Sequence, residues 1–409
     1  MKYIDEYKLF KSIINYTDSQ ITVSEDSIIR NFSFTSKNCF LLPDGSCDET
    51  LNGYDPKFET GITHKMLDIN DTDVKDNISF RYHVFSPIQV KKAKQIVLMF
   101  HGFNEKDWYK YLPWASHIAH QTGKTIVLFP IAFHMNRAPR EWSDTRPMYE
   151  VSNRRKELFP DIICSSLSNA AISTRLHTKP QRFIWSGLQS YYDIIQFIEY
   201  YKSGLHPFIS PDAEVDMFAY SIGSFLAEVL MMTNHRNYFD KSKLVMFCGG
   251  TVFNRLSPVS KFILDSQANV ALYSYIIEHL DSHLRKDEKL RHYLCELPEG
   301  MGFRCMLNYG AMSDFREERL RAIAQRLLVV TLKKDTVVPP YEITNTLQGK
   351  YRDIPVRVDM YDLPYPYKHE DPFPALEKNS DEIDAGFRKI FDPIGLFLSD
   401  NIPDSCISF

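Results

Sequence analysis

One serine of the chain, Ser221, lies at a predicted strand-to-helix turn, where a nucleophilic hydroxyl could be exposed. Ser221 follows the apolar run VDMFAY at 215–220 and precedes IGSFLAEVL, a pattern that predicts a strand turning sharply into a helix. Such a turn strains the backbone and brings strand and helix close together, so small residues are needed two positions to either side, and Ala219 and Gly223 stand there. The Ile222 amide would then lie at a helix N-terminus, where it can donate to a developing oxyanion. The alternative is that Ser221 is only a helix N-cap.

A histidine and a glycine follow an earlier apolar run. His101 and Gly102 come directly after IVLMF at 96–100, and Phe103 and Asn104 come next. Glycine allows the backbone to turn tightly at the end of a strand. A plain β-turn that contains glycine is the alternative interpretation.

A candidate acid follows a late apolar run. RLLVVTL at 326–332 has the composition of a strand buried on both faces, and Asp335 begins the sequence DTVVP a few residues later. A carboxylate in such a loop can hold a histidine in one tautomer. Asp359 and Asp362, on or just after the next predicted strand, are possible substitutes, and a solvated loop aspartate beside two lysines is the alternative.

The candidate base is His369. It follows the predicted strand VRVDMYDL at 356–363 and is the only histidine after His292. The last loop of a parallel sheet can fold back over the sheet centre, where Ser221 is expected, although a surface histidine in a charged loop is the alternative. HED at 369–371 lacks the second histidine of a helical zinc motif, so we predict no metal ligands and no organic cofactor.

These motifs, in this order, resemble the α/β-hydrolase superfamily of serine esterases, lipases and peptidases. The resemblance covers roughly residues 96–400, and Ala219 stands where the nucleophile elbow usually has its first glycine. It implies an α/β fold in which helices flank a mainly parallel central sheet. It also implies a structural role for His101. The implied site comprises a catalytic triad of Ser221, Asp335 and His369, and an oxyanion hole formed by the backbone N–H groups of Phe103 and Ile222.

The resemblance implies a serine hydrolase that cleaves a carboxylic ester, thioester or amide through an acyl-enzyme, with a carboxylesterase as the main expectation. A catalytically inactive binding protein on the same fold is one alternative. An acyltransferase, in which an alcohol or amine replaces water, is another. The expected partner is a small-molecule or acyl substrate, and the sequence does not define the oligomeric state.

The elements around these motifs fall into two predicted parts. Residues 1–90 predict an N-terminal helix and antiparallel strands, with turn clusters at 43–46, 52–56 and 70–73, and we expect them to pack on or join the main sheet. Residues 91–400 alternate buried strands and helices, which predicts a parallel sheet with its ligand site beyond the carboxyl ends of the strands. The expected helices are 111–122, 187–203, 222–233 and 381–399.

Two segments interrupt this alternation and predict a cap or lid over the site. Residues 131–185 look irregular as far as 182, and residues 252–322 look mainly helical. The first segment also contains two tryptophans and a set of arginines, which could bind an anionic or aromatic acyl group or could form a solvated face. The arginines are Arg137, Arg140, Arg146, Arg154 and Arg155.

Composition excludes several classes of function. The 409 residues carry a formal net charge of −4, so no basic surface for nucleic acid is expected. No run approaches the roughly 18 apolar residues of a membrane span, and the first residues, MKYIDEYKLF, do not form a secretory signal. Seven scattered cysteines without a C-x-x-C pair predict reduced thiols and a cytoplasmic protein.

Overall fold

The computed structural model describes residues 1–15, 17–43 and 69–399. The turn predicted at 52–56, and all but the first residue of the turn predicted at 43–46, therefore lie outside the described residues. At the third predicted turn, Asp71–Asp73 forms a short 3-10 helix.

The described strands form one nine-stranded sheet in the order β1-β2-β3-β5-β4-β6-β7-β8-β9. β1, β2 and β3 pair antiparallel with their neighbours, including β3 with β5, and the pairs from β5 to β9 are parallel. The antiparallel strands expected between residues 21 and 90 thus join the main sheet. The strands are β1 (Gln20–Thr22), β2 (Ser27–Thr35), β3 (Ser79–Pro87), β4 (Ala93–Phe100), β5 (Thr125–Leu128), β6 (Ile209–Tyr220), β7 (Leu244–Phe247), β8 (Leu327–Leu332) and β9 (Arg357–Tyr361).

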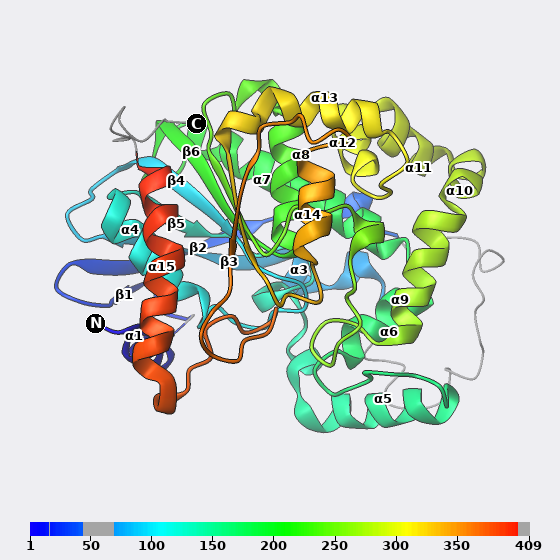
Figure 1. The fold of residues 1–409 in the computed structure, drawn as a ribbon, viewed down its shortest axis with the longest axis horizontal. Helices are drawn as coiled ribbons and strands as arrows, with labels where there is room; N and C mark the ends of the chain where they lie inside the picture. Colours follow the sequence, from blue (N-terminus) through cyan, green and yellow to red (C-terminus); the bar gives the residue numbers. More distant parts are fainter. Residues whose placement is uncertain (16, 44–68, 400–409) are drawn as a thin grey trace.

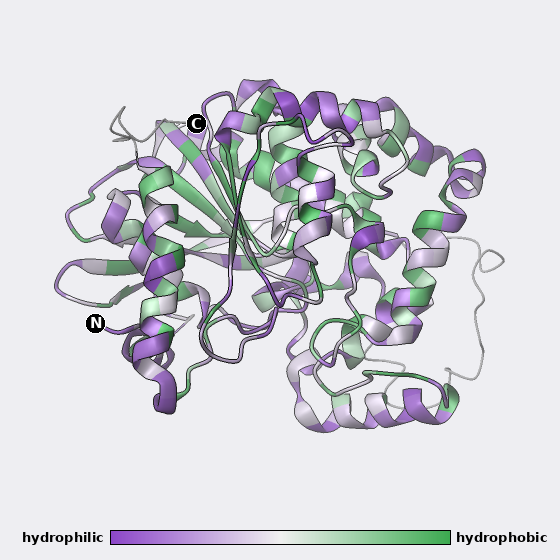
Figure 2. Cartoon of the chain, in the orientation of Figure 1, coloured by the Kyte–Doolittle hydropathy of each residue, from purple (hydrophilic) through white to green (hydrophobic). Residues whose placement is uncertain are grey.

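Helices cover both faces of this sheet (Figure 1). On one face lie α1 (Tyr3–Ile13), α4 (Tyr111–Thr122) and α15 (Ser380–Leu398), and on the other lie α7 (Arg182–Lys202), α8 (Ile222–Thr233) and α14 (Pro340–Leu347). Successive residues of a strand point to opposite faces, so Val97 and Met99 of β4 pack with the first layer while Ile96 and Leu98 pack with the second. β7 is accordingly wholly apolar, and β4 and β6 are apolar mainly towards their carboxyl ends (Figure 2).

This topology confirms the predicted fold class. The sheet of this protein is mainly parallel and has helices on both faces. β8 and β9 lie at one edge, and the antiparallel N-terminal strands β1 to β3 lie at the other. The chain has the α/β-hydrolase fold. Of the predicted helices, 111–122 and 222–233 match α4 and α8, and 381–399 matches α15 within one residue at each end.

The segments 131–185 and 252–322 together contribute most of a helical lobe beside the sheet, which is the part of Figure 1 that contains α5, α6, α9, α10 and α11. The lobe contains α5 (Thr145–Leu158), α6 (Ala170–Thr178), α9 (Ser266–Tyr273), α10 (Leu280–Lys286) and α11 (Glu288–Arg291). The second segment continues into α12 (Pro298–Cys305) and α13 (Ser313–Ile323), which pack on α8. Two π-helical turns, Ser274–Glu278 and His292–Glu296, interrupt the second segment. The short α3 (Lys75–Ile78) lies before β3.

The expectation of irregular structure up to residue 182 is wrong, because α5 and α6 lie in this segment and α7 begins at Arg182 and not at 187. Apolar periodicity does not reveal α5 because its buried face includes an arginine. Arg155 is fully buried and makes a two-bond ion pair with Asp265, at 2.7 and 2.8 Å, which joins the first inserted segment to the second.

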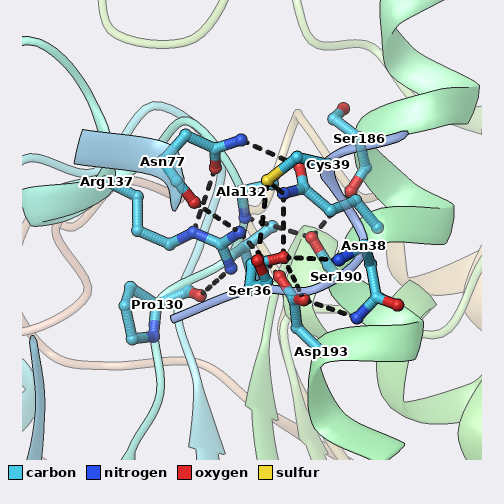
Figure 3. A network of polar contacts seen from close by, with 12 residues as sticks. Ser36, Asn38, Cys39, Asn77, Pro130, Ala132, Arg137, Ser186, Ser190 and Asp193 are labelled. Atoms are coloured by element: carbon cyan, nitrogen blue, oxygen red, sulfur yellow. Dashed lines mark hydrogen bonds and ion pairs between the residues drawn. The ribbon is translucent and has the colours of Figure 1, made fainter. Parts of the chain in front are cut away.

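A second buried arginine ties the start of the lobe to the sheet and to α7. Arg137 pairs with Asp193 at 2.7 Å, and both side chains are fully buried. Arg137 also donates to Asn77 Oδ1, while Ser36 and Asn38 donate to Asp193 (Figure 3). Because Arg146 and Arg154 are exposed, the arginines of this segment divide into internal ion pairs and a solvated surface, and none of them lines the cavity at Ser221.

No helix in the described part of the chain combines the length and apolar character needed to cross a bilayer.

Candidate active site

Ser221 sits on a strained turn between β6 and α8. Its backbone has φ 55° and ψ −121°, a region that a residue with a side chain rarely adopts and that costs roughly 1–3 kcal/mol. The turn is held because the Ser221 N–H donates to Phe247 O at 3.1 Å and the Ser224 N–H donates to Ser221 O at 2.9 Å. The Ser221 side chain makes no N-cap hydrogen bond, so the alternative role as a cap does not describe it.

The small residues around Ser221 are required by contact. A Cβ on Gly223 would lie 2.8 Å from His101 O and 2.8 Å from the Phe100 Cβ, closer than real Cβ atoms come. Ala219 is fully buried in the central strand. The sequence rule of small residues two positions to either side of Ser221 therefore has a direct steric cause here.

The structure brings the three sequence-predicted side chains together. Ser221 Oγ lies 2.8 Å from His369 Nε2, and His369 Nδ1 lies 2.7 Å from Asp335 Oδ2. Asp335 and His369 are both buried. The second oxygen of Asp335 accepts the N–H groups of Val337 and Val338, each at 2.9 Å, and these bonds fix the orientation of the carboxylate.

The two substitute acids are engaged elsewhere. Asp359 pairs with Arg357 at 2.6 Å on the surface, and Asp362 pairs with Lys334 at 3.0 Å. Asp335 is the carboxylate that reaches His369. With Asp335 accepting from Nδ1–H, His369 Nε2 is left as the acceptor for the Ser221 hydroxyl, which is the arrangement of a general base.

His101 is structural in this fold. Its Nε2 accepts the Ile131 N–H at 2.9 Å, and its Nδ1–H donates to Gly102 O at 2.8 Å. Complete burial lowers the pKa of His101 well below its usual value, so the imidazole is neutral and committed to holding the loop after β4.

Phe103 and Ile222 lie at the same cavity as Ser221. Ile222 is the first residue of α8, and the first N–H groups of a helix have no partner within it. The loop that carries Phe103 is fixed by the next residue, since the Asn104 amide donates to Ser168 O at 2.9 Å and to Phe262 O at 2.6 Å. One side chain thus ties this loop to both inserted segments.

Sequence reasoning missed two residues that position the His369 loop. The Tyr220 hydroxyl donates to His369 O, and the two rings stack at 5.5 Å with an angle of 18°. Lys110 pairs with Glu105 and donates to Glu370 O at 2.9 Å, so it links the loop after β4 to the last loop. The only available signal was that Tyr220 directly precedes Ser221, and this adjacency does not reveal the contact.

Cys248, the residue after β7, is also close to these groups. One ligand atom from each of Cys248, Asp335 and His369 lies within 4.8 Å of the others, which makes them the one cluster among the described residues that could hold a metal ion. Burial and the neighbouring carboxylate raise the pKa of the Cys248 thiol well above its usual value. A neutral thiol beside an imidazole and a carboxylate that already bond to each other is a poor ligand set for a metal, which binds the thiolate.

A family model described as a family of unknown function, DUF6051, matches residues 1–399. The chain belongs to this family. No curated protein matches the chain. Among solved structures, carboxyl esterase 2 from the mycorrhizal fungus Tuber melanosporum is similar at 11% identity and a TM-score of 0.41, over 77% of this chain and 80% of that one.

Two further solved structures give similar values. The esterase Est22 is 12% identical with a TM-score of 0.44, over 92% of this chain and 80% of its own. A peroxisomal α/β-hydrolase from Saccharomyces cerevisiae is 10% identical with a TM-score of 0.39, over 93% and 92%.

Proposed function

We propose that the chain is a serine hydrolase that cleaves a carboxylic ester, with Ser221 as nucleophile, His369 as general base and Asp335 as the acid that orients it. The observation that carries the proposal is the continuous relay of 2.8 Å from Ser221 Oγ to His369 Nε2 and 2.7 Å from His369 Nδ1 to Asp335. The backbone strain stored at Ser221 adds support, because such strain concentrates at functional sites.

In this mechanism His369 Nε2 takes the proton from Ser221 Oγ as the oxygen attacks the ester carbonyl. The N–H groups of Phe103 and Ile222 receive the charge of the tetrahedral intermediate, and loss of one such donor typically slows a reaction ~100- to 1000-fold. His369 then gives its proton to the departing alcohol, which leaves the acyl group on Ser221. Water, activated by the same imidazole, releases the acid.

The direct test is covalent labelling with a fluorophosphonate probe, read by intact mass and peptide mapping. We expect stoichiometric labelling at Ser221 in the folded protein and none in Ser221→Ala. Ser203→Ala is the control, because Ser203 is an exposed serine after α7, and this variant should leave labelling intact. Folded wild-type protein that stays unlabelled would contradict the proposal and favour a binding protein on the same fold.

We also place this reaction in the cytoplasm. The support is that the five cysteines among the described residues are all free thiols, as expected in a reducing compartment. Fractionation of cells that produce the protein would test this placement.

A further inference from the structure

Three cavities meet at the loop that carries Phe103, and they differ in chemistry. The first contains Ser221 and is otherwise lined by side chains such as Leu256, Leu264 and Leu272. The second lies beyond it towards Val229 and Phe303. The third combines the charged residues Glu105, Lys106, Asp107 and Glu370 with apolar residues that include Trp142, Leu167 and Phe262.

The first two cavities suit an apolar chain. In the part of the chain that the structure describes, neither wall carries a charged residue near neutral pH, because the one titratable imidazole, His134 in the second cavity, has its pKa lowered by burial to about 4. The hydroxyls there already have partners. Ser186 donates to Arg182 O, Ser190 donates to Ser186 O, and Thr251 shares a hydrogen bond with Thr346. His134 Nε2 is buried in the wall of the second cavity without a hydrogen-bond partner among the described residues, so a polar ligand would find one acceptor there but would lose most of its hydration without compensation.

Two aromatic rings stand between the first and second cavities. Phe183 of α7 and Phe225 of α8 line both, and their centroids lie 6.3 Å apart in an edge-to-face arrangement. Both rings also pack on Phe303, at 6.2 and 5.1 Å. The two rings are therefore held in place by packing and separate the first cavity from the second.

The third cavity is the one assigned to the departing alcohol. It shares Phe103 with the first cavity and includes Glu370, which follows His369 in the sequence, and His369 is the group that protonates the departing oxygen in the proposed mechanism. Lys106, whose pKa burial lowers to about 8, and the carboxylates nearby favour a group that can form hydrogen bonds.

We infer that the substrate is an ester of an unbranched apolar acyl chain with a polar, hydroxyl-bearing alcohol, and that Phe183 and Phe225 set the longest acyl chain accepted. The inference rests on the proposed function and adds to it a substrate class and a pair of specificity residues. The acyl chain fills the first cavity from Ser221 outward and ends at the aromatic partition, while the alcohol occupies the third cavity.

The test measures kcat/KM for glycerol monoesters of a series of straight-chain acids, from acetate to hexadecanoate. For wild-type protein we expect a rise of about four-fold per added methylene while the chain fills apolar space, then a sharp fall. Phe183→Ala should move the optimum to longer chains, Phe183→Leu should move it less, and Leu272→Phe should move it to shorter ones. The hexyl ester of the best acid should react more slowly than its glycerol ester.

Fluorophosphonate titration of wild-type protein and of each variant distinguishes a failure of the proposed hydrolase function from a failure of the inferred acyl-chain specificity. If wild-type protein is not labelled, the proposed function fails. If all proteins label at Ser221 but kcat/KM is independent of acyl length, or the optimum stays fixed in both Phe183 variants, the inference is overturned while the proposed function stands. Should Phe183→Ala fail to fold, Phe183→Leu and Leu272→Phe still predict shifts in opposite directions.

Discussion

The carboxylate of Asp335 has two separate tasks, one for each oxygen. Oδ1 accepts the amides of Val337 and Val338, and Oδ2 faces His369 Nδ1. The first task is structural and the second is electrostatic. An asparagine could keep the first through its carbonyl oxygen, but its NH₂ group would then face the imidazole and favour the wrong tautomer.

We therefore expect Asp335→Asn to lower kcat by about 10⁴-fold with little change in the thermal midpoint of unfolding. Steady-state kinetics on the best glycerol ester and a thermal melt measure the two effects. Asp362→Asn is the control, since Asp362 pairs with Lys334 at the surface, and it should retain activity. Comparable losses in both variants would argue against Asp335 as the orienting acid.

At the scale of residues, the sequence predicts the three side chains of the proposed triad but not the residues that position them. Ser221, Asp335 and His369 each follow an apolar run, and the carboxyl ends of parallel strands share one edge, so their meeting is predictable. Tyr220 and Lys110 act on the last loop through contacts across 149 and 260 positions of sequence. No local pattern encodes such a pairing.

At the scale of elements, buried ion pairs join the helical lobe to the body of the protein. The Arg137–Asp193 pair connects the loop after β5 to α7 and also holds the segment after β2 through Ser36 (Figure 3). Removing one partner of a buried pair leaves an uncompensated charge, which is far more costly than breaking an exposed pair.

We expect Arg137→Met to lower the free energy of unfolding by about 3–5 kcal/mol, measured by urea denaturation. Arg154→Met removes an exposed pair with Glu157 and should cost less than about 1 kcal/mol. Equal, small effects would mean that Asp193 finds other donors, for example Asn38, which already bonds to it.

The helices also show where apolar patterns in the sequence fail to predict an element. Helices whose buried residues are almost all apolar, such as α4, are predicted to the residue, whereas α5 is missed because Arg155 occupies its buried face. The partner that allows this burial, Asp265, lies in the other inserted segment. Helix periodicity records burial only when the buried residues are apolar.

At the scale of the whole molecule, buried histidines make the stability of the fold depend on pH. Burial lowers the pKa of His83 to about 3 and those of His134 and His206 to about 4. In His206, Nδ1 also accepts the N–H groups of Phe208 and Ile209 at 3.0 and 2.8 Å. A proton on that nitrogen would break both hydrogen bonds.

Histidines with lowered pKa values bind protons more readily in the unfolded chain, so their contribution to stability is complete above pH ~6.5 and is lost as pH falls towards ~4. We expect these histidines to make the urea midpoint decline steadily as pH falls over that interval. His206→Gln, which offers an oxygen acceptor without titrating, should make the decline shallower. A midpoint that does not change down to pH ~4 would contradict this account.

The first and last helices of the fold share one apolar seam. The Tyr3 N–H donates to Asp384 at 2.9 Å, and the Tyr3 ring packs on Phe373 and Phe387 at 5.5 and 4.8 Å. During synthesis Tyr3 therefore reaches these contacts only after α15, which supplies Asp384 and Phe387, has also been made. A chain truncated before α15 would leave the apolar residues of this seam exposed and available to chaperones.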